Sequence, residues 1–190
     1  MLFGCLTEHK IDLKRTMASE SQKIGKWMIW LSWLIVLGFL SVFFNNQLEK
    51  RQNPNQQINS MVSSQGMTEI VLKRNPAGHY VASGFINNKP VIFLLDTGAS
   101  DVSVPAKVAN RIGLKKGQPL VYQTANGSTR GYLTQLDSIS LGEIELNNIR
   151  GGINPSMQGE YILLGMTFLK HLEFTQRGNE LTIRQYPNDH

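Results

Sequence analysis

Cysteine is almost absent from this sequence: Cys5 is the only one among 190 residues. A single cysteine excludes an internal disulfide bond. The four histidines do not stand at metal-ligand spacing from one another or from this thiol. Gly151-Gly152 is too short for a phosphate-binding loop, and no nucleophile elbow is completed after Gly98-Ala99-Ser100. The sequence therefore predicts no metal and no other cofactor.

A concentrated patch of basic charge is also missing. The formal net charge is +5 and the sequence pI is about 9.4. From Met67 onward, however, basic and acidic residues nearly balance, and the basic ones form no stripe with interleaved aromatic residues. The sequence therefore predicts no nucleic acid as a partner.

One long run without charge is present, at residues 27–44. As a helix it would span about 27 Å, close to the roughly 30 Å of a bilayer core. Trp27, Trp30 and Trp33 crowd its start, as expected of an interfacial aromatic belt. No small-residue cleavage site follows, so we expect a transmembrane signal anchor that is retained. A cleaved signal peptide and a buried core helix are the alternatives.

Positive residues predict the orientation of this anchor, because five of them precede the run. The positive-inside rule places residues 1–26 in the cytoplasm and the C-terminal part outside, which is the periplasm in a Gram-negative cell. We therefore expect a single-pass protein of the inner (cytoplasmic) membrane. Met17 could also be the true start, with residues 1–16 an upstream extension.

Beyond the anchor the composition changes twice. Residues 45–66 are rich in Asn, Gln and Ser, which predicts a flexible linker. Residues 67–190 contain short apolar strands between turns, typical of a small all-β domain, barrel-like or sandwich-like. One short helix is expected at residues 106–112, after Pro105 and before Gly113.

The chemistry is expected at Asp96, which follows the apolar run 93–95 and opens a small-residue turn at 97–100. A second block, residues 161–169, contains an apolar strand, a glycine and a short apolar segment. Together the two blocks resemble the active-site loop and the core-closing strand, glycine and helix of retropepsin-like aspartic proteases. With the apolar anchor, the chain is similar to the bacterial membrane-anchored members of that family.

This resemblance covers about residues 68–186 and implies a closed β-barrel, one half of an acid protease, with one or two short helices. It implies that Asp96 is catalytic. The active-site loop would also contain Thr97, Gly98, Ala99 and Ser100. The Thr97 hydroxyl would bond across a dimer, and the Gly98 N–H would approach the carboxylate closely.

Peptide hydrolysis by carboxylates requires two groups that share one proton, one acting as base and the other as acid. The chain has one such loop, since Asp101 and Asp137 lack the glycine turn. The second carboxylate is therefore expected from Asp96 of another copy. The predicted function is that of a homodimeric aspartic endopeptidase acting on a peptide or protein substrate.

A predicted hairpin near residue 126 stands where a retropepsin has its flap. The candidate flap residues are Thr124, Ala125, Asn126 and Gly127. The hairpin lacks the glycine-dense tip of retroviral enzymes, so a plain hairpin is the alternative. For the whole chain the alternative is a non-catalytic dimerisation or peptide-binding module, but the intact Asp96-Thr97-Gly98 favours the enzyme.

Overall fold

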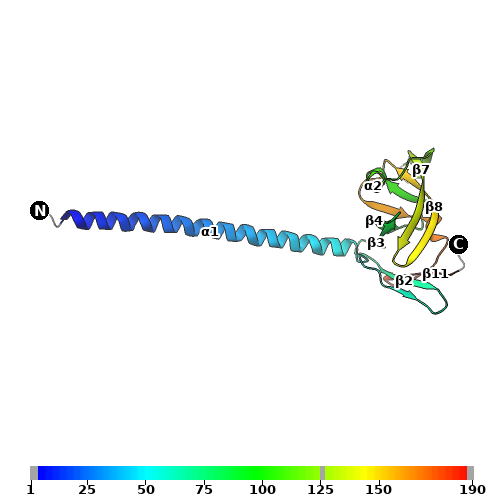
Figure 1. Ribbon diagram of the computed structural model, residues 1–190, viewed down its shortest axis with the longest axis horizontal. Helices are drawn as coiled ribbons and strands as arrows, with labels where there is room; N and C mark the ends of the chain where they lie inside the picture. The colour runs from blue at the N-terminus through cyan, green and yellow to red at the C-terminus, as the bar shows by residue number, and fades with distance from the viewer. Residues whose placement is uncertain (1–3, 125–126, 188–190) are drawn as a thin grey trace. The chain divides into compact units, whose positions relative to one another are not determined.

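The computed structural model describes residues 4–124 and 127–187 (Figure 1). The chain divides into two compact units, Met1–Leu48 and Glu49–His190. The first unit is helical and the second contains all the strands. The folded unit thus begins earlier than the predicted boundary at Met67.

Helix α1, Gly4–Gln52, contains the apolar run. Its segment Trp27–Gln52 has a mean hydropathy of 2.1 and is long and apolar enough to cross a membrane, a test that signal sequences also pass. None of the apolar window is buried, and Trp27 is 76% exposed. The alternative of a buried core helix is therefore wrong.

The residues after α1 differ from the predicted flexible linker. The helix continues to Gln52, and Asn55 is buried in the second unit. The Asn55 side chain donates to the carbonyls of Lys73 (2.9 Å) and Val81 (2.7 Å) and accepts from the Lys73 N–H (2.7 Å). The amide thus satisfies backbone groups of two strands, a role that composition alone does not reveal.

A seven-stranded sheet forms most of the second unit, in the order β3-β4-β9-β5-β8-β7-β6. Pairing of β3 with β7 at Phe85↔Ser140 and Ile86↔Ile139 closes it, which confirms the expected barrel. Its strands are β3 Val81–Ile86, β4 Lys89–Leu95, β5 Val102–Pro105, β6 Pro119–Thr124, β7 Gly127–Leu141, β8 Ile144–Asn154 and β9 Tyr161–Leu164.

The second sheet has four antiparallel strands in the order β1-β2-β11-β10. Their bounds are β1 Ser60–Val62, β2 Thr68–Lys73, β10 Glu173–Arg177 and β11 Glu180–Gln185. Ile70 and Leu72 of β2, with Leu181 and Ile183 of β11, are buried against the common core. Figure 1 shows β2 and β11 side by side below the barrel strands.

Two short helices complete the unit. Helix α2, Ala106–Ile112, ends at Gly113 with φ 76°, as expected from the sequence, and α3 is Met166–Leu169. The turn between β3 and β4 has two residues, Asn87 and Asn88, with φ of 48° and 60°. Such φ values are typical of a type I′ hairpin, in which asparagine tolerates the left-handed conformation.

Alternation of apolar side chains directs β4 into the core. Val91 and Phe93 are buried, and complete burial of Phe93 contributes about 1.5–3 kcal/mol. Gly84 of β3 permits this packing, because a Cβ there would lie 2.4 Å from the Ser140 carbonyl and 2.7 Å from the Phe93 ring. The strand that leads to Asp96 is therefore fixed by tight packing on its inner face.

Candidate active site

Asp96 directly follows β4, an interior strand of the barrel. Strand β4 runs parallel to β9, with Leu95 opposite Leu164. The Asp96 N–H donates to the Leu164 carbonyl (3.3 Å), and the Leu95 N–H donates to the Tyr80 carbonyl (3.0 Å). Hydrogen bonds to Leu164 on one side and to Tyr80 on the other thus fix the backbone at Leu95 and Asp96.

The segment from Asp96 to Asp101 passes across the end of β9, because β9 lies between β4 and β5. Backbone N–H groups in the first turn of α3 form hydrogen bonds with this loop. The Met166 N–H donates to the Ala99 carbonyl (2.8 Å) and the Thr167 N–H to the Ser100 carbonyl (3.0 Å). The Thr167 hydroxyl also accepts the Val102 N–H (3.0 Å). The two sequence blocks therefore meet in space.

Gly165 allows this contact. A Cβ at Gly165 would lie 2.4 Å from the Asp101 carbonyl oxygen and 2.6 Å from the Ala99 carbonyl oxygen. Both distances are too short for any side chain, and the neighbours are backbone atoms that cannot move aside independently. The glycine of the second block is therefore required by close approach of the loop.

The carboxylate of Asp96 is held by its own turn. The Gly98 N–H donates to Asp96 Oδ1 (2.9 Å), and the Ala99 N–H donates to the Asp96 carbonyl (3.2 Å). A Cβ at Gly98 would lie 3.2 Å from that carboxylate oxygen. The expected close approach of the Gly98 amide is present. One carboxylate oxygen is thereby fixed.

The tip of the loop faces solvent. Asp96 and Ala99 are half-buried, whereas Thr97, Gly98 and Ser100 are exposed. Within residues 27–121 and 127–187, where side chains are described, the Thr97 hydroxyl has no hydrogen-bond partner. The loop is therefore accessible to a substrate or to another copy of the chain.

The other aspartates near the barrel are engaged elsewhere. Asp101 Oδ1 lies 3.3 Å from a guanidinium nitrogen of Arg150, and Asp137 Oδ2 accepts from the Asn87 amide (3.0 Å). Arg150 could not have been identified in advance, because strand pairing brings it to Asp101. Within the described residues no group of three or more His, Cys, Asp or Glu side chains could hold a metal ion.

The predicted flap region is a hairpin of β6 and β7, paired from Pro119↔Tyr132 to Thr124↔Gly127. The pairing thus includes Thr124 and Gly127, the first and last of the four candidate flap residues. Ala125 and Asn126, two of the four candidate flap residues, lie outside the described residues. Order in the sheet places β8 and β5 between this hairpin and the strand β9 beneath the Asp96 loop.

The comparison with family models matches residues 82–171 to the "gag-polyprotein putative aspartyl protease" model. The matched segment begins in β3, contains the Asp96 loop and Gly165, and ends just after α3. It therefore includes both sequence blocks that meet at the site.

Two proteins are similar in sequence. One is an uncharacterized protein in the cobV 5′ region of Sinorhizobium sp, 31% identical over 168 residues, which are 82% of this chain and 71% of the relative. The other is the uncharacterized protein RP867 of Rickettsia prowazekii, 31% identical over 121 residues, which are 62% of this chain and 52% of the relative.

A solved structure is similar as well: the crystal structure of a retropepsin-like aspartic protease from Rickettsia conorii. It is 26% identical, with a TM-score of 0.52, and the match covers 68% of this chain and 95% of that chain.

Proposed function

Because this chain belongs to the retropepsin-like aspartic protease family, we propose that it is a homodimeric aspartic endopeptidase anchored in a membrane. The observation that carries the proposal is the intact Asp96 loop at the end of β4. Its carboxylate is bonded to the Gly98 N–H and its backbone to β9. That arrangement holds one carboxylate at a solvent-facing position.

Each subunit would supply one Asp96, and the two carboxyl groups would share one proton. One takes a proton from water as the water oxygen bonds to the scissile carbonyl carbon. The other gives its proton to the carbonyl oxygen, which forms a geminal diol. As the C–N bond breaks, the nitrogen takes a proton from one carboxyl group. The other regains a proton from the diol, so the shared-proton state returns.

A second copy is needed because this chain supplies one such loop. The carboxylates of Asp101 and Asp137 are bonded to Arg150 and Asn87 respectively, so neither would serve as the second catalytic carboxylate. The exposed Thr97 hydroxyl is available to bond across a two-fold axis. A two-fold axis between the loops would place two equivalent carboxylates together, as the reaction requires.

The substrate would be a peptide or protein, covered by the β6–β7 hairpin acting as a flap. A flap excludes water and adds contacts to an extended substrate. This role for residues 124–127 rests on the order of the elements and on the family. The same chemistry needs neither metal nor other cofactor.

Helix α1 would serve as the anchor, with residues 27–44 in the membrane. The excess of Lys and Arg before the span favours a cytoplasmic N-terminus and a protease domain outside the cytoplasmic membrane. An alkaline phosphatase fused after His190 would be active in this orientation. Activity only of a reporter that works in the cytoplasm would contradict it.

Asp96→Asn tests the enzyme assignment. The amide keeps the size of the side chain but cannot share the proton, so cleavage by the purified full-length protein should fall at least about a hundredfold. Asp137→Asn is the matched control, because it makes the same change at an exposed aspartate of β7. New peptide N-termini are counted by mass spectrometry. Cleavage by the Asp96→Asn protein at the wild-type rate would refute the assignment.

A further inference from the structure

The helix that contains the apolar run continues directly into the folded unit. Helix α1 ends at Gln52, and the second unit begins at Glu49, so the last turn of the helix belongs to that unit. Between Phe44, where the apolar run ends, and Gln52 the sequence contains neither proline nor glycine. Eight helical residues advance about 12 Å. Residues 45–52, the first part of the expected linker, therefore have a fixed length.

Hydrogen bonds join the end of α1 to the folded unit. The Asn75 side-chain amide donates to the Gln52 carbonyl (3.0 Å), and the Tyr161 hydroxyl donates to Gln52 Oε1 (3.4 Å). The Asn53 amide donates to the Ser83 hydroxyl (2.9 Å). The helix end is thus bonded to the turn before β3, to β3 itself and to β9.

The residues that follow run beside β3. Asn53 is 6% exposed and Asn55 is 4% exposed. Asn55 pairs with Ala82 in a parallel bridge, and its side chain is bonded to backbone groups of Lys73 and Val81. The chain therefore reaches the barrel within three residues of the end of α1, and this part of the expected linker cannot extend freely.

These contacts limit the distance between Asp96 and the apolar run. Three residues from the end of α1 to Asn55 span at most about 10 Å. Asn55 lies beside Ala82, and Ala82 lies opposite Phe93; each step between neighbouring strands is about 4.8 Å. Three more residues, about 10 Å, lead from Phe93 to Asp96.

Together with the helical residues 45–52, these steps place Asp96 at most about 42 Å from the end of the apolar run. The limit follows from chain length and strand pairing, so it holds for any angle between α1 and the folded unit. A flexible chain over residues 45–66 could instead extend to about 70 Å. The structure therefore gives the site a short reach from the anchor.

We propose that the substrates of this site are membrane-anchored proteins, cleaved in an accessible segment that lies within about 40 Å of the bilayer. The inference rests on the proposed function, membrane anchoring included, and adds the substrate class. A segment must come to the height of the Asp96 loop to be cleaved. A protein fixed in the same bilayer meets this condition only where its accessible segment lies close to the membrane.

Confinement to one plane also favours such substrates. Two molecules anchored in the same bilayer have a high effective concentration when their reacting segments can meet, and almost none when the geometry keeps them apart. A soluble protein can reach the loop as well, but without this gain. Height above the bilayer therefore selects among anchored substrates, in addition to the sequence of the segment.

Two substrates made of the same parts test the limit. Each contains a transmembrane helix, a parallel dimeric coiled coil and an unfolded segment of β-casein. In the low substrate the casein segment directly follows the transmembrane helix. In the high substrate a coiled coil of about 60 residues, continuous with that helix, raises the casein segment by about 90 Å. A casein segment of about 20 residues has an r.m.s. length of about 25 Å, too short to return to the Asp96 loop.

The full-length protease and one substrate are reconstituted together in liposomes, and new peptide N-termini are counted by mass spectrometry. We expect cleavage of the low substrate to be at least about tenfold faster than cleavage of the high one. The Asp96→Asn protein should cleave neither. Equal rates for the two substrates would overturn the inference.

A lengthened protease is an independent variant. A flexible Gly-Ser linker of about 60 residues, inserted between Leu48 and Glu49 at the boundary of the two units, adds an r.m.s. length of about 43 Å. Cleavage of the high substrate should then rise at least about fivefold. The same linker added after His190 is the matched control, because it leaves the distance between the anchor and Asp96 unchanged. Equal effects of the two linkers would overturn the inference.

These outcomes separate the inference from the proposed function. Asp96-dependent cleavage of both anchored substrates at equal rates, or of soluble β-casein alone, would overturn the height limit and leave the peptidase standing. Absence of Asp96-dependent cleavage from both anchored substrates and from soluble β-casein would refute the peptidase, and the inference with it.

Discussion

Replacing Gly165 by alanine adds only one methyl group, but we expect it to displace the Asp96 loop and to lower the stability of the protein. The added Cβ would lie 2.4 and 2.6 Å from the carbonyl oxygens of Asp101 and Ala99. Since both neighbours are backbone, the loop must move away from α3. That movement breaks the bonds from the N–H groups of Met166 and Thr167.

The magnitude follows from these losses. Overpacking costs about 1–3 kcal/mol, and two lost hydrogen bonds add about 0.5–1.5 kcal/mol each. We expect Gly165→Ala to lower the free energy of unfolding by about 2–6 kcal/mol. Urea unfolding of a Glu49–His190 fragment, followed by far-ultraviolet circular dichroism, measures this quantity.

Gly159→Ala is the control for this substitution. Gly159 has φ 89°, but a Cβ there would meet no atom within 4 Å. Backbone strain alone should cost about 1–2 kcal/mol. If Gly165→Ala were no more destabilising than Gly159→Ala, close packing of the loop on α3 would not be what holds Asp96.

Three further predictions follow from the fold and the site. Phe93→Ala should lower the free energy of unfolding by about 3–5 kcal/mol in the same urea assay, because it empties a fully buried site beneath β4. Lys107 and then Arg111 hold the pKa of Glu160 below its usual value, so Glu160→Gln should destabilise the protein at neutral pH. The difference in melting temperature should be present above about pH 4.5 and decrease as the pH falls through the lowered pKa; a difference that does not change with pH would contradict the ion pair. Peptidase activity should fall more than in proportion to enzyme concentration on dilution, since each subunit supplies one Asp96, and strict proportionality would argue against a dimeric site.

Much of the barrel was predictable because local rules agree with the tertiary structure. Helix α2 forms where Pro105 and Gly113 mark its ends, and the hairpin of β3 and β4 forms around two asparagines. The Asp96 loop was predictable too, since a short apolar strand and a small-residue turn are visible in sequence. These features depend on neighbouring residues, which a sequence displays directly.

The segment after α1 was not predictable in the same way. Its amide-rich composition is typical of a linker, but Asn55 bonds to backbone groups of β2 and to Val81 at the start of β3. An amide side chain can form hydrogen bonds with water in a flexible linker. In this protein the Asn55 amide instead forms them with buried backbone donors and acceptors. Only the positions of the strands decide between these outcomes.

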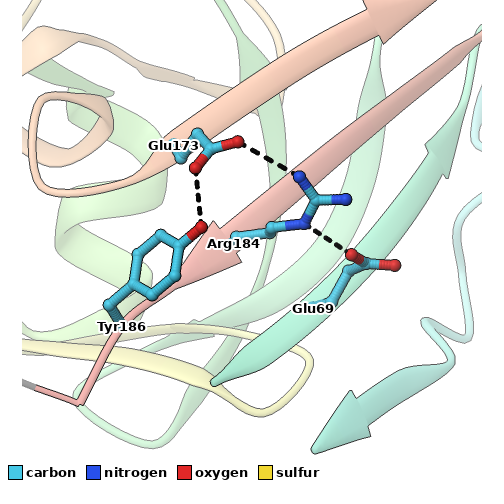
Figure 2. Close-up of polar contacts among 4 residues, drawn as sticks. All are labelled: Glu69, Glu173, Arg184 and Tyr186. Atoms are coloured by element: carbon cyan, nitrogen blue, oxygen red, sulfur yellow. Dashed lines mark hydrogen bonds and ion pairs between the residues drawn. The ribbon is translucent and has the colours of Figure 1, made fainter. Parts of the chain in front are cut away.

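The charges of the four-stranded sheet show the same dependence on the positions of the strands. Three strands each have an acid followed four residues later by a base: Glu69 and Lys73, Glu173 and Arg177, Glu180 and Arg184. In a helix that spacing would favour pairs within one element. On a strand it places the two charges on one face, too far apart to pair with each other. Antiparallel neighbours then match acid with base whatever their order in the sheet. Glu69, Arg184 and Glu173 therefore form one row across β2, β11 and β10, with the base between the two acids (Figure 2).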